Sequence, residues 1–316
     1  MIEEPATVDV SVVVPVYRSA PIVPALVART CAALAGAAGA PTFEIVLVCD
    51  ASPDDSWTAI RAASAADPRV RGVLLRRNAG QHNATMAGLH HARGAKIVVM
   101  DDDLQHPPEA IPSMLARLDE GFDVCYTRYL HRKHPLWKRL GSAVNDHAAR
   151  VLLGKPANLY LSSFKALQRE VAREVVRYDG PFAYVDGLLL DVTRHITTVD
   201  IEHGERHAGA GNYTLRTSLQ LWLKMATSFS VYPLRLMAVG GFVLAMISAA
   251  FGIGIAIYKL MHPEIPAGWT SLIATILFVG GIQMLGLGLL GEYLGRAYLK
   301  LNRKPQFVVR TTTFDP

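Results

Sequence analysis

Short apolar runs alternate with longer stretches of mixed character over the first 130 positions of the chain. Each run is rich in Val, Ile and Leu, which is typical of a buried strand. Strands are expected at residues 10–16, 44–49, 70–75, 96–100 and 123–126. The segments between them predict helices at residues 22–37, 52–66 and 82–92. Strands that alternate with helices at this spacing predict a doubly wound, mostly parallel α/β sheet.

The pattern changes near the C-terminus, where residues 236–258 and 269–291 each form a stretch of 23 positions without a charge. Each stretch can cross a hydrocarbon core of about 30 Å as a helix. We therefore expect a hairpin of two transmembrane helices rather than two buried core helices. Several Lys and Arg residues follow the second stretch, whereas the loop carries only Lys259. Because positive charge marks the cytoplasmic side, both termini are expected in the cytoplasm.

Composition supports a membrane protein, since 51% of the 316 residues are hydrophobic and the mean hydropathy is +0.22. The net charge of +5 is modest. Aromatic and basic residues are not interleaved, so we expect anionic lipid and phosphate, not nucleic acid, as partners. Cys31, Cys49 and Cys125 have no metal-binding or redox spacing and are expected to be packed thiols in a reducing compartment. The polar start of the chain predicts no signal peptide.

Two further segments have apolar residues at helical spacing with basic residues between them, among them Lys138 and Arg139 in residues 133–153. A helix of this kind can lie in the membrane interface, although a helix packed on the sheet gives the same pattern. The second segment leads into the first span. The expected division is a cytoplasmic α/β domain at 1–214, a juxtamembrane amphipathic helix at 215–234, two transmembrane helices within 235–295 and a basic tail at 296–316.

The strongest chemical signal is the triplet Asp101-Asp102-Asp103, which follows the fourth apolar run. Asp101 and Asp103 lie two positions apart beyond a strand end, so both can converge on one hard cation, which prefers oxygen ligands. Such a cation would hold a diphosphate and neutralise it as it leaves. An acidic helix N-terminus is the alternative, because Pro107 and Pro108 begin a helix just afterwards.

Polar residues also follow the other predicted strands, and the carboxyl ends of parallel strands are where α/β sheets bind ligands. These residues are Tyr17, Asp50, Asp54, Asn78 and Gly80. The first strand is not followed by a Gly-x-Gly-x-x-Gly motif, and the chain has no Gly-x-x-x-x-Gly-Lys-Ser/Thr motif. Dinucleotide-binding and P-loop proteins are therefore disfavoured.

Four strings of residues resemble the family 2 glycosyltransferases of GT-A fold, a Rossmann-like α/β fold. They are Pro15-Val16-Tyr17, Asp50-Ala51-Ser52-Pro53-Asp54, Asn78-Ala79-Gly80 and Asp101-Asp102-Asp103-Leu104-Gln105-His106-Pro107-Pro108-Glu109. The last string, combined with a C-terminal hairpin, resembles the polyprenyl-phosphate glycosyltransferases in particular. Stretches at 153–165, 184–188, 211–216 and 291–296 resemble the undecaprenyl-phosphate sugar transferases of this group, among them those for formamido-arabinose and for glucose.

The resemblance implies an inverting transfer of one sugar from a nucleotide-sugar, expected to be UDP-linked, to undecaprenyl or another polyprenyl phosphate at the cytoplasmic face of a bacterial inner membrane. It implies Mg²⁺ or Mn²⁺ held by Asp101, Asp103 and Gln105. The candidate catalytic residues are Asp101, Asp103 and Asp186, of which Asp186 would orient the acceptor or act as a base. The acceptor phosphate is expected to meet Arg128, Lys138, Arg139 and Ser142.

By the same resemblance, the nucleotide-sugar would be bound by Pro15, Tyr17, Asp50, Asp54, Asn78, Gly80, Asp102 and Arg206. Asp50 would contact the base, and Arg206 would grip the diphosphate from a mobile loop. The chain departs from the family pattern at Cys49, at Arg18-Ser19 and at Gly211. The first two departures concern contacts to the nucleoside, and the third concerns closure of the Arg206 loop.

Two alternatives stay open. A processive polysaccharide synthase would carry more spans and a Gln-x-x-Arg-Trp-like motif, and a non-catalytic nucleotide-sugar-binding scaffold would not need the acidic triplet. The sugar is also open: amino- or formamido-arabinose, glucose and other hexoses all fit an envelope glycan or lipid A modification. Glycines in both uncharged stretches permit close helix packing and predict a homo-oligomer.

Overall fold

A computed structural model of the chain describes residues 6–129, 156, 159–180, 183–201, 232–261, 268–302 and 304–314. The chain forms two compact units. The first comprises Met1–Tyr213 together with Arg303–Pro316, and the second comprises Thr214–Asn302. The predicted interfacial helix at 133–153 and most of the predicted juxtamembrane helix at 215–234 lie outside the described residues.

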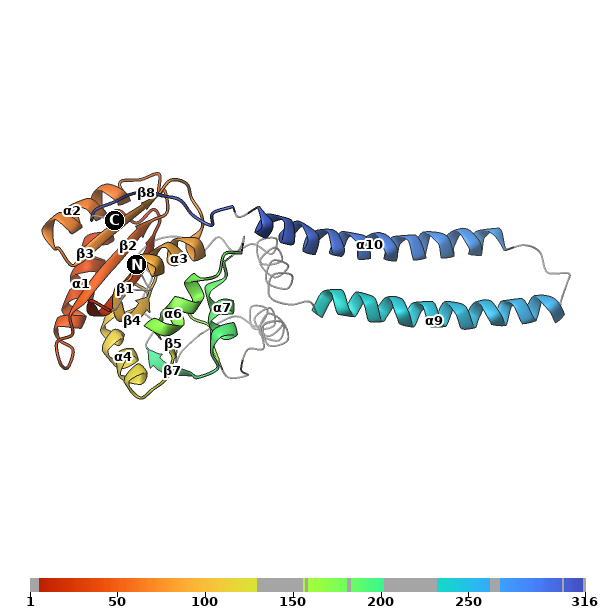
Figure 1. The fold of residues 1–316 in the computed structure, drawn as a ribbon, viewed down its shortest axis with the longest axis horizontal. Helices are drawn as coiled ribbons and strands as arrows, with labels where there is room; N and C mark the ends of the chain where they lie inside the picture. The colour runs from red at the N-terminus through yellow and green to blue at the C-terminus, as the bar shows by residue number, and fades with distance from the viewer. Residues whose placement is uncertain are drawn as a thin grey trace. The chain divides into compact units, whose positions relative to one another are not determined.

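The first unit is built on an eight-stranded mixed sheet with the strand order β7-β5-β6-β4-β1-β2-β3-β8 (Figure 1). The strands are β1 (Val8–Val16), β2 (Phe43–Cys49), β3 (Val70–Leu75), β4 (Gly94–Val99), β5 (Val124–Tyr129), β6 (Lys165–Gln168), β7 (Ile196–Ile201) and β8 (Val309–Thr312). β6 and β8 run antiparallel to their neighbours, and the other strands share one direction. The predicted Rossmann-like sheet is therefore confirmed as a mixed sheet.

Helices cover both faces of this sheet, and the core lies between the layers. On one face, α1 (Val23–Ala35), α2 (Ser56–Ala66) and α4 (Ile111–Asp119) pack together. On the other face are α3 (Gln81–His91), α6 (Arg169–Val176) and α7 (Val185–Val192). Successive side chains of a strand point to opposite faces. Val12 thus belongs to the core with Leu26 of α1, whereas Val13 faces Gly88 of α3, where an added Cβ would come within 2.3 Å of Val13.

The residues after the second long helix return to the sheet. β8 pairs antiparallel with β3 as the strand at that edge. Thr313 Oγ1 accepts a hydrogen bond of 2.8 Å from the backbone N–H of Gly72. The segment 296–316, expected only as a basic tail, therefore also completes the sheet.

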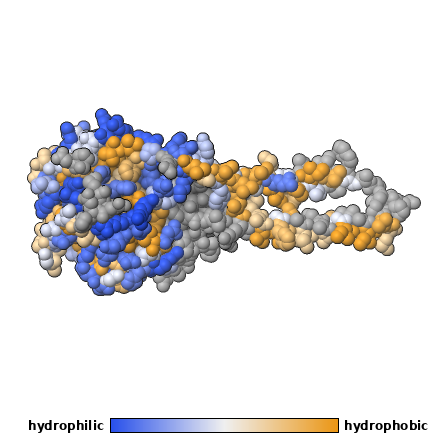
Figure 2. Space-filling view, in the orientation of Figure 1, coloured by the Kyte–Doolittle hydropathy of each residue, from blue (hydrophilic) through white to orange (hydrophobic). Residues whose placement is uncertain are grey.

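The second unit contains two long helices, α9 (Tyr232–Met261) and α10 (Trp269–Leu301). Large apolar side chains are exposed on both, including Phe242 at 68% and Leu294 at 72%, and Figure 2 shows the apolar surface in orange. Within the described residues, one helical stretch, Phe278–Leu301, is long and apolar enough to cross a membrane. So much exposed apolar surface indicates contact with an apolar phase or a partner.

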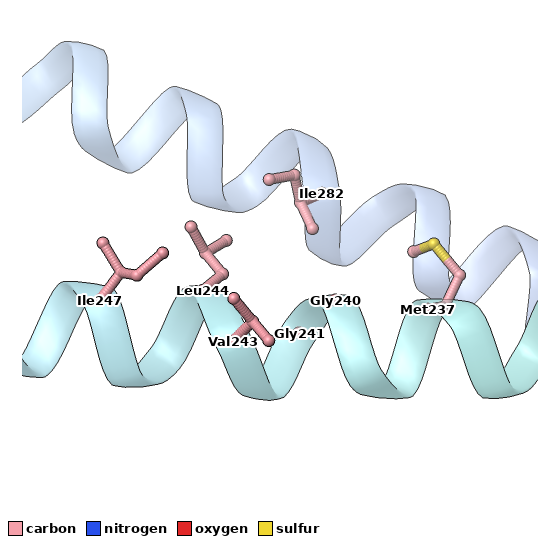
Figure 3. A pocket seen from close by; sticks show the side chains of 7 residues that line it. All are labelled: Met237, Gly240, Gly241, Val243, Leu244, Ile247 and Ile282. Atoms are coloured by element: carbon pink, nitrogen blue, oxygen red, sulfur yellow. The ribbon is translucent and has the colours of Figure 1, made fainter.

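An apolar groove of about 340 Å³ lies between α9 and α10, with Leu244 and Ile282 pointing into it (Figure 3). Gly240 and Gly241 also line this groove, and a Cβ added at either would meet nothing within 4 Å. These glycines therefore do not serve close packing of the two helices within one chain. The predicted homo-oligomer stays a prediction.

Candidate active site

A pocket of about 430 Å³ opens at the carboxyl edge of the sheet, where β1, β2, β3 and β4 end. Ligand sites of α/β sheets lie at this edge because the loops that follow parallel strands converge there. The pocket is lined by Pro15, Val16, Tyr17, Asp50, Asn78, Gly80, Gln81, Asp101, Asp102, Asp103 and Gln105. The structure thus brings together most of the residues predicted to bind a nucleotide-sugar and a metal.

The loop after β3 is fixed by Asp50, which follows β2. The carboxylate of Asp50 is 3% exposed and accepts hydrogen bonds from the backbone N–H groups of Ala79 (2.7 Å) and Gly80 (2.9 Å). Gly80 has φ +86°, in the left-handed region that favours glycine. Both carboxylate oxygens of Asp50 therefore hold the loop that forms one wall of the pocket.

The loop after β1 is fixed by Asp102, whose Oδ2 accepts a hydrogen bond of 3.0 Å from the backbone N–H of Tyr17. Burial raises the pKa of Asp102, although the Ser19 hydroxyl and the Tyr17 amide favour its charged form. The Tyr17 ring stays 42% exposed beside the pocket. Asp102 thus braces the loop that carries Tyr17.

Backbone strain gathers at the same edge of the sheet. Among the described non-glycine residues, four have positive φ, and three of these follow strands that end at the pocket: Arg18 at 57°, Ala51 at 48° and Leu104 at 57°. Such conformations are uncommon for residues with a Cβ and persist where the surroundings enforce them, often at functional sites. The tight loops let neighbouring strand ends present their side chains to one pocket.

Asp101 and Asp103 offer oxygen atoms to the pocket. Asp101 Oδ1 accepts a 2.6 Å hydrogen bond from Gln81 Nε2, and Asp101 Oδ2 accepts one of 2.6 Å from Ser163 Oγ. Asp103 Oδ1 accepts a hydrogen bond of 3.1 Å from the backbone N–H of Gln105. No group of three or more His, Cys, Asp or Glu side chains that could enclose a metal occurs in the described part of the chain.

Two carboxylates and the amide of Gln105 still fit a divalent cation in chemical terms. Mg²⁺ is usually bound through one or two carboxylates while waters and substrate phosphates supply the remaining ligands, so it needs no all-protein cage. The donor set is made of oxygen, which suits Mg²⁺ and Mn²⁺. The residues present are therefore compatible with a metal shared with a bound diphosphate.

Asp54 does not line the pocket, contrary to the expectation that it would bind the nucleotide-sugar. Its Oδ1 accepts hydrogen bonds from Ser52 Oγ (2.5 Å) and Ser56 Oγ (2.6 Å), and its Oδ2 accepts one from the N–H of Ala20 (3.2 Å). Burial acts to raise the pKa of Asp54, but these hydrogen bonds outweigh it and lower the pKa to about 2. Asp54 fixes the start of α2 to the loop after β1.

Asp186 is also not among the residues that line the pocket, and it belongs to a buried cluster. It forms an ion pair with Lys165 and accepts a hydrogen bond of 3.0 Å from Tyr126 Oη. Asp186 and Lys165 are 7% and 3% exposed. A carboxylate committed to a buried ammonium is poorly placed to take a proton from an acceptor, so the contacts favour a structural role for Asp186 over the predicted catalytic one.

Arg128 is the acceptor-binding candidate that the structure describes. It is the last residue but one of β5 and lies at the same sheet edge as Asp101, because β5 and β4 both run antiparallel to β6. Its guanidinium is bidentate to Asp200 at 2.6 and 2.9 Å and is half exposed. The other predicted residues, Arg206, Lys138, Arg139 and Ser142, lie outside the described residues.

Three described residues that contact Asp101 were not predicted to do so. Gln81 directly follows Gly80, a predicted pocket residue, and this position in the sequence could have identified it. Ser163 lies 62 positions from Asp101, and no local pattern identifies it. The backbone N–H of Asp101 also donates a 3.1 Å hydrogen bond to Nδ1 of the buried His106, a residue quoted only as part of the longest string.

The mixed sheet and the carboxylate-lined pocket at its edge define an α/β enzyme of GT-A fold. The chain belongs to glycosyl transferase family 2, whose family model matches residues 11–176. It is therefore a glycosyltransferase, as the sequence predicted.

Two relatives match over nearly the whole chain. Undecaprenyl-phosphate 4-deoxy-4-formamido-L-arabinose transferase of Shewanella sediminis (strain HAW-EB3) is 35% identical over 304 residues, 95% of this chain and 91% of that protein. The enzyme of the same name from Klebsiella pneumoniae subsp. pneumoniae is 33% identical over 319 residues, 100% of this chain and 97% of that protein.

Among solved structures, the chain is similar to glucosyl-3-phosphoglycerate synthase from Mycobacterium tuberculosis in complex with Mn²⁺, UDP-glucose and phosphoglyceric acid. The TM-score is 0.50 at 18% sequence identity, over 71% of this chain and 79% of that chain. This likeness supports the GT-A fold.

Proposed function

We propose that this enzyme transfers one sugar from a UDP-sugar to undecaprenyl phosphate, with inversion, at the cytoplasmic face of a bacterial inner membrane. The pocket formed by Asp50, Asn78 and the acidic triplet carries the proposal, because its loops and carboxylates suit a nucleoside diphosphate with a divalent cation. The names of the nearly full-length relatives support the acceptor. The UDP-sugar and Mn²⁺ in the similar solved structure support the donor and the metal.

Asp101, Asp103 and Gln105 would hold Mg²⁺ or Mn²⁺, which supplies charge stabilisation to the departing diphosphate. Asp50 shapes the wall against which the nucleoside lies, and Asp102 holds the Tyr17 loop on the other side. The acceptor phosphate is anionic near neutral pH and attacks without a strong base, since its second pKa is about 6. This agrees with the commitment of Asp186 to Lys165.

The second unit would anchor the enzyme beside its lipid acceptor. The two-helix hairpin is supported by the exposed apolar side chains of α9 and α10 and by the apolar stretch Phe278–Leu301. An anchored enzyme and a membrane-bound substrate meet at a raised effective concentration. The predicted cytoplasmic position of both termini, the interfacial helices and the homo-oligomer belong to this proposal.

The test is transfer of radiolabelled sugar from a panel of UDP-sugars to undecaprenyl phosphate by the purified full chain with Mg²⁺ or Mn²⁺. Asp103→Asn is expected to lower the rate on the order of 100- to 1,000-fold, because it removes a charge that the reaction needs. Asp119→Asn, at an exposed acid of α4 outside the pocket, is the matched control and should leave the rate unchanged.

Equal labelling by the wild type and Asp103→Asn would contradict the proposal, as would absence of lipid-linked label with every donor. The anomeric configuration of the product, determined by NMR, tests inversion separately. Label that grows into a polymer would favour the processive synthase instead.

A further inference from the structure

The carboxylate of Asp101 is held from both sides by neutral donors. Gln81, at the start of α3, donates a hydrogen bond to Oδ1, and Ser163, just before β6, donates one to Oδ2. Both hydrogen bonds are 2.6 Å long. Hydrogen bonds to both oxygens fix the plane of the carboxylate as well as its position. Neither donor brings a charge, so the two hydrogen bonds orient the Asp101 carboxylate without pairing it with a cation.

The pairing of β6 with β4 brings Ser163 next to Asp101. β6 pairs antiparallel with β4, with Val99 opposite Lys165. Continuing this register by two residues along each strand brings Ser163 opposite Asp101. The contact therefore lies two residues beyond the last paired residues of β4 and β6, and it depends on a pairing between distant segments.

The buried His106 contacts both Asp101 and Ser163. The imidazole is 5% exposed, and its ring stacks on Phe164 with centroids 5.2 Å apart and an interplanar angle of 22°. Nδ1 accepts the backbone N–H of Asp101 at 3.1 Å, so the hydrogen of the neutral ring lies on Nε2. Nε2 is 3.5 Å from Ser163 Oγ. With that tautomer, the Nε2 hydrogen can point at the Ser163 oxygen while the Ser163 hydroxyl donates to Asp101.

We propose that Ser163, oriented by His106, is a positioning residue that fixes the Asp101 carboxylate for the divalent cation of the sugar transfer. The inference rests on the proposed function and adds to it a residue outside the pocket lining. Partners that orient a ligating side chain typically contribute 10- to 100-fold to metal affinity. Loss of the Ser163 hydroxyl should therefore weaken binding of the metal more than binding of the nucleotide.

The experiment measures Mn²⁺ binding to the full chain in lipid nanodiscs, with UDP present, by the electron paramagnetic resonance signal of free Mn²⁺. Ser163→Ala is expected to weaken Mn²⁺ binding about 10-fold, and Ser163→Thr, which keeps the hydroxyl, should restore it. Ser163→Cys, a weak donor of similar size, should fall between them. Ser113→Ala, at an exposed serine of α4, is the control and should bind as the wild type does.

Sugar transfer is measured in parallel as a function of Mn²⁺ concentration. For Ser163→Ala we expect half-activation at about 10-fold higher Mn²⁺, with the rate recovering at saturation and the KM for UDP-sugar little changed. A merely structural role would lower the rate at every Mn²⁺ concentration and would not be rescued by threonine. That outcome overturns the inference.

The other outcomes separate the inference from the proposed function. If the wild type binds Mn²⁺ and transfers sugar, and Ser163→Ala has an unchanged Mn²⁺ affinity, the positioning role is wrong and the function stands. A wild type that neither binds Mn²⁺ in the presence of UDP nor transfers sugar overturns both. Should Ser163→Ala not fold, the Thr and Cys variants decide the question by whether affinity follows the strength of the donor.

Discussion

Glu44 at the amino end of the sheet and the acidic triplet at the carboxyl end differ in whether basic side chains neutralise them. At the amino end, Glu44 is 1% exposed and forms ion pairs with Arg71 at 3.0 Å and Arg93 at 2.8 Å. At the carboxyl end, Asp101, Asp102 and Asp103 stand in sequence and lie beside a pocket. In the described part of the chain, no Lys or Arg forms an ion pair with any of these three aspartates.

The difference separates a structural acid from acids kept for a ligand. Glu44 is satisfied within the protein, because Ser11 Oγ and the N–H of Arg93 also donate to its Oε1 at 2.6 and 2.7 Å. The acids at the carboxyl end receive hydrogen bonds mainly from neutral groups, so their charge is oriented but not neutralised. A charge left uncompensated in a pocket favours binding of a cation.

The largest expected loss of stability comes from removing the charge of Glu44 at the amino end of the sheet. Glu44→Gln leaves the guanidinium groups of Arg71 and Arg93 close together without their counter-charge. We expect the free energy of unfolding to fall by about 3 kcal/mol, measured by thermal and urea unfolding of the detergent-solubilised protein.

The same change at the carboxyl end is the matched control. Asp103→Asn, which should nearly abolish transfer, is expected to change stability by no more than about 0.5 kcal/mol, because it breaks no ion pair among the described residues. Equal loss of stability in the two variants would show that the ends of the sheet do not differ as described.

A smaller loss of stability is expected from removing the Phe314 ring, which packs on Arg71 at the amino end of the sheet. The Phe314 ring lies over the Arg71 guanidinium, 3.7 Å from its Cζ, and meets the His91 ring edge-on at 5.6 Å. Phe314→Ala should lower the free energy of unfolding by about 2 kcal/mol, the upper range for a cation–π contact. Phe314→Leu keeps apolar bulk without the ring and should recover part of the loss.

Melting of Phe314→Ala at the wild-type temperature would mean that the packing of this ring adds nothing to the stability of the sheet.

The strands visible in the sequence are those that the sheet buries on both faces. β1, β2 and β3 are nearly continuous apolar runs, and each lies within two residues of its expected position. β7 was not predicted, and it is a mostly half-buried strand at the edge of the sheet. β6 and β8 also escaped prediction, because they have four residues each and contain Lys165 and Arg310. The places of these two strands depend on pairing with distant strands. Their antiparallel direction is likewise a property of the assembled sheet.

The residues of the candidate site were predictable to the same extent as the strands that precede them. Residues that directly follow a strand, such as Asp50 and Asp101, could be placed at one edge because parallel strands end together. Asp54 was grouped with them by its position in the string, but its hydrogen bonds serve the turn before α2. Ser163 could not be found, because its contact with Asp101 follows from the β4–β6 register.

Among the three structural contacts, Asp54 gives the smallest expected loss of stability, and it shows that the carboxyl end also contains a structural acid. Asp54→Ala removes the acceptor for Ser52, Ser56 and the N–H of Ala20, and we expect a loss of about 1 kcal/mol at pH 7, as for a helix cap. The folded pKa of Asp54 is about 2, below the ordinary 3.8. Its contribution is therefore fully present above about pH 4 and is lost as the pH falls through the folded pKa of about 2. The free energies of unfolding of the wild type and the variant should converge as the pH passes below about 2, whereas a difference that persists there would assign the effect of Asp54 to packing and not to its charge.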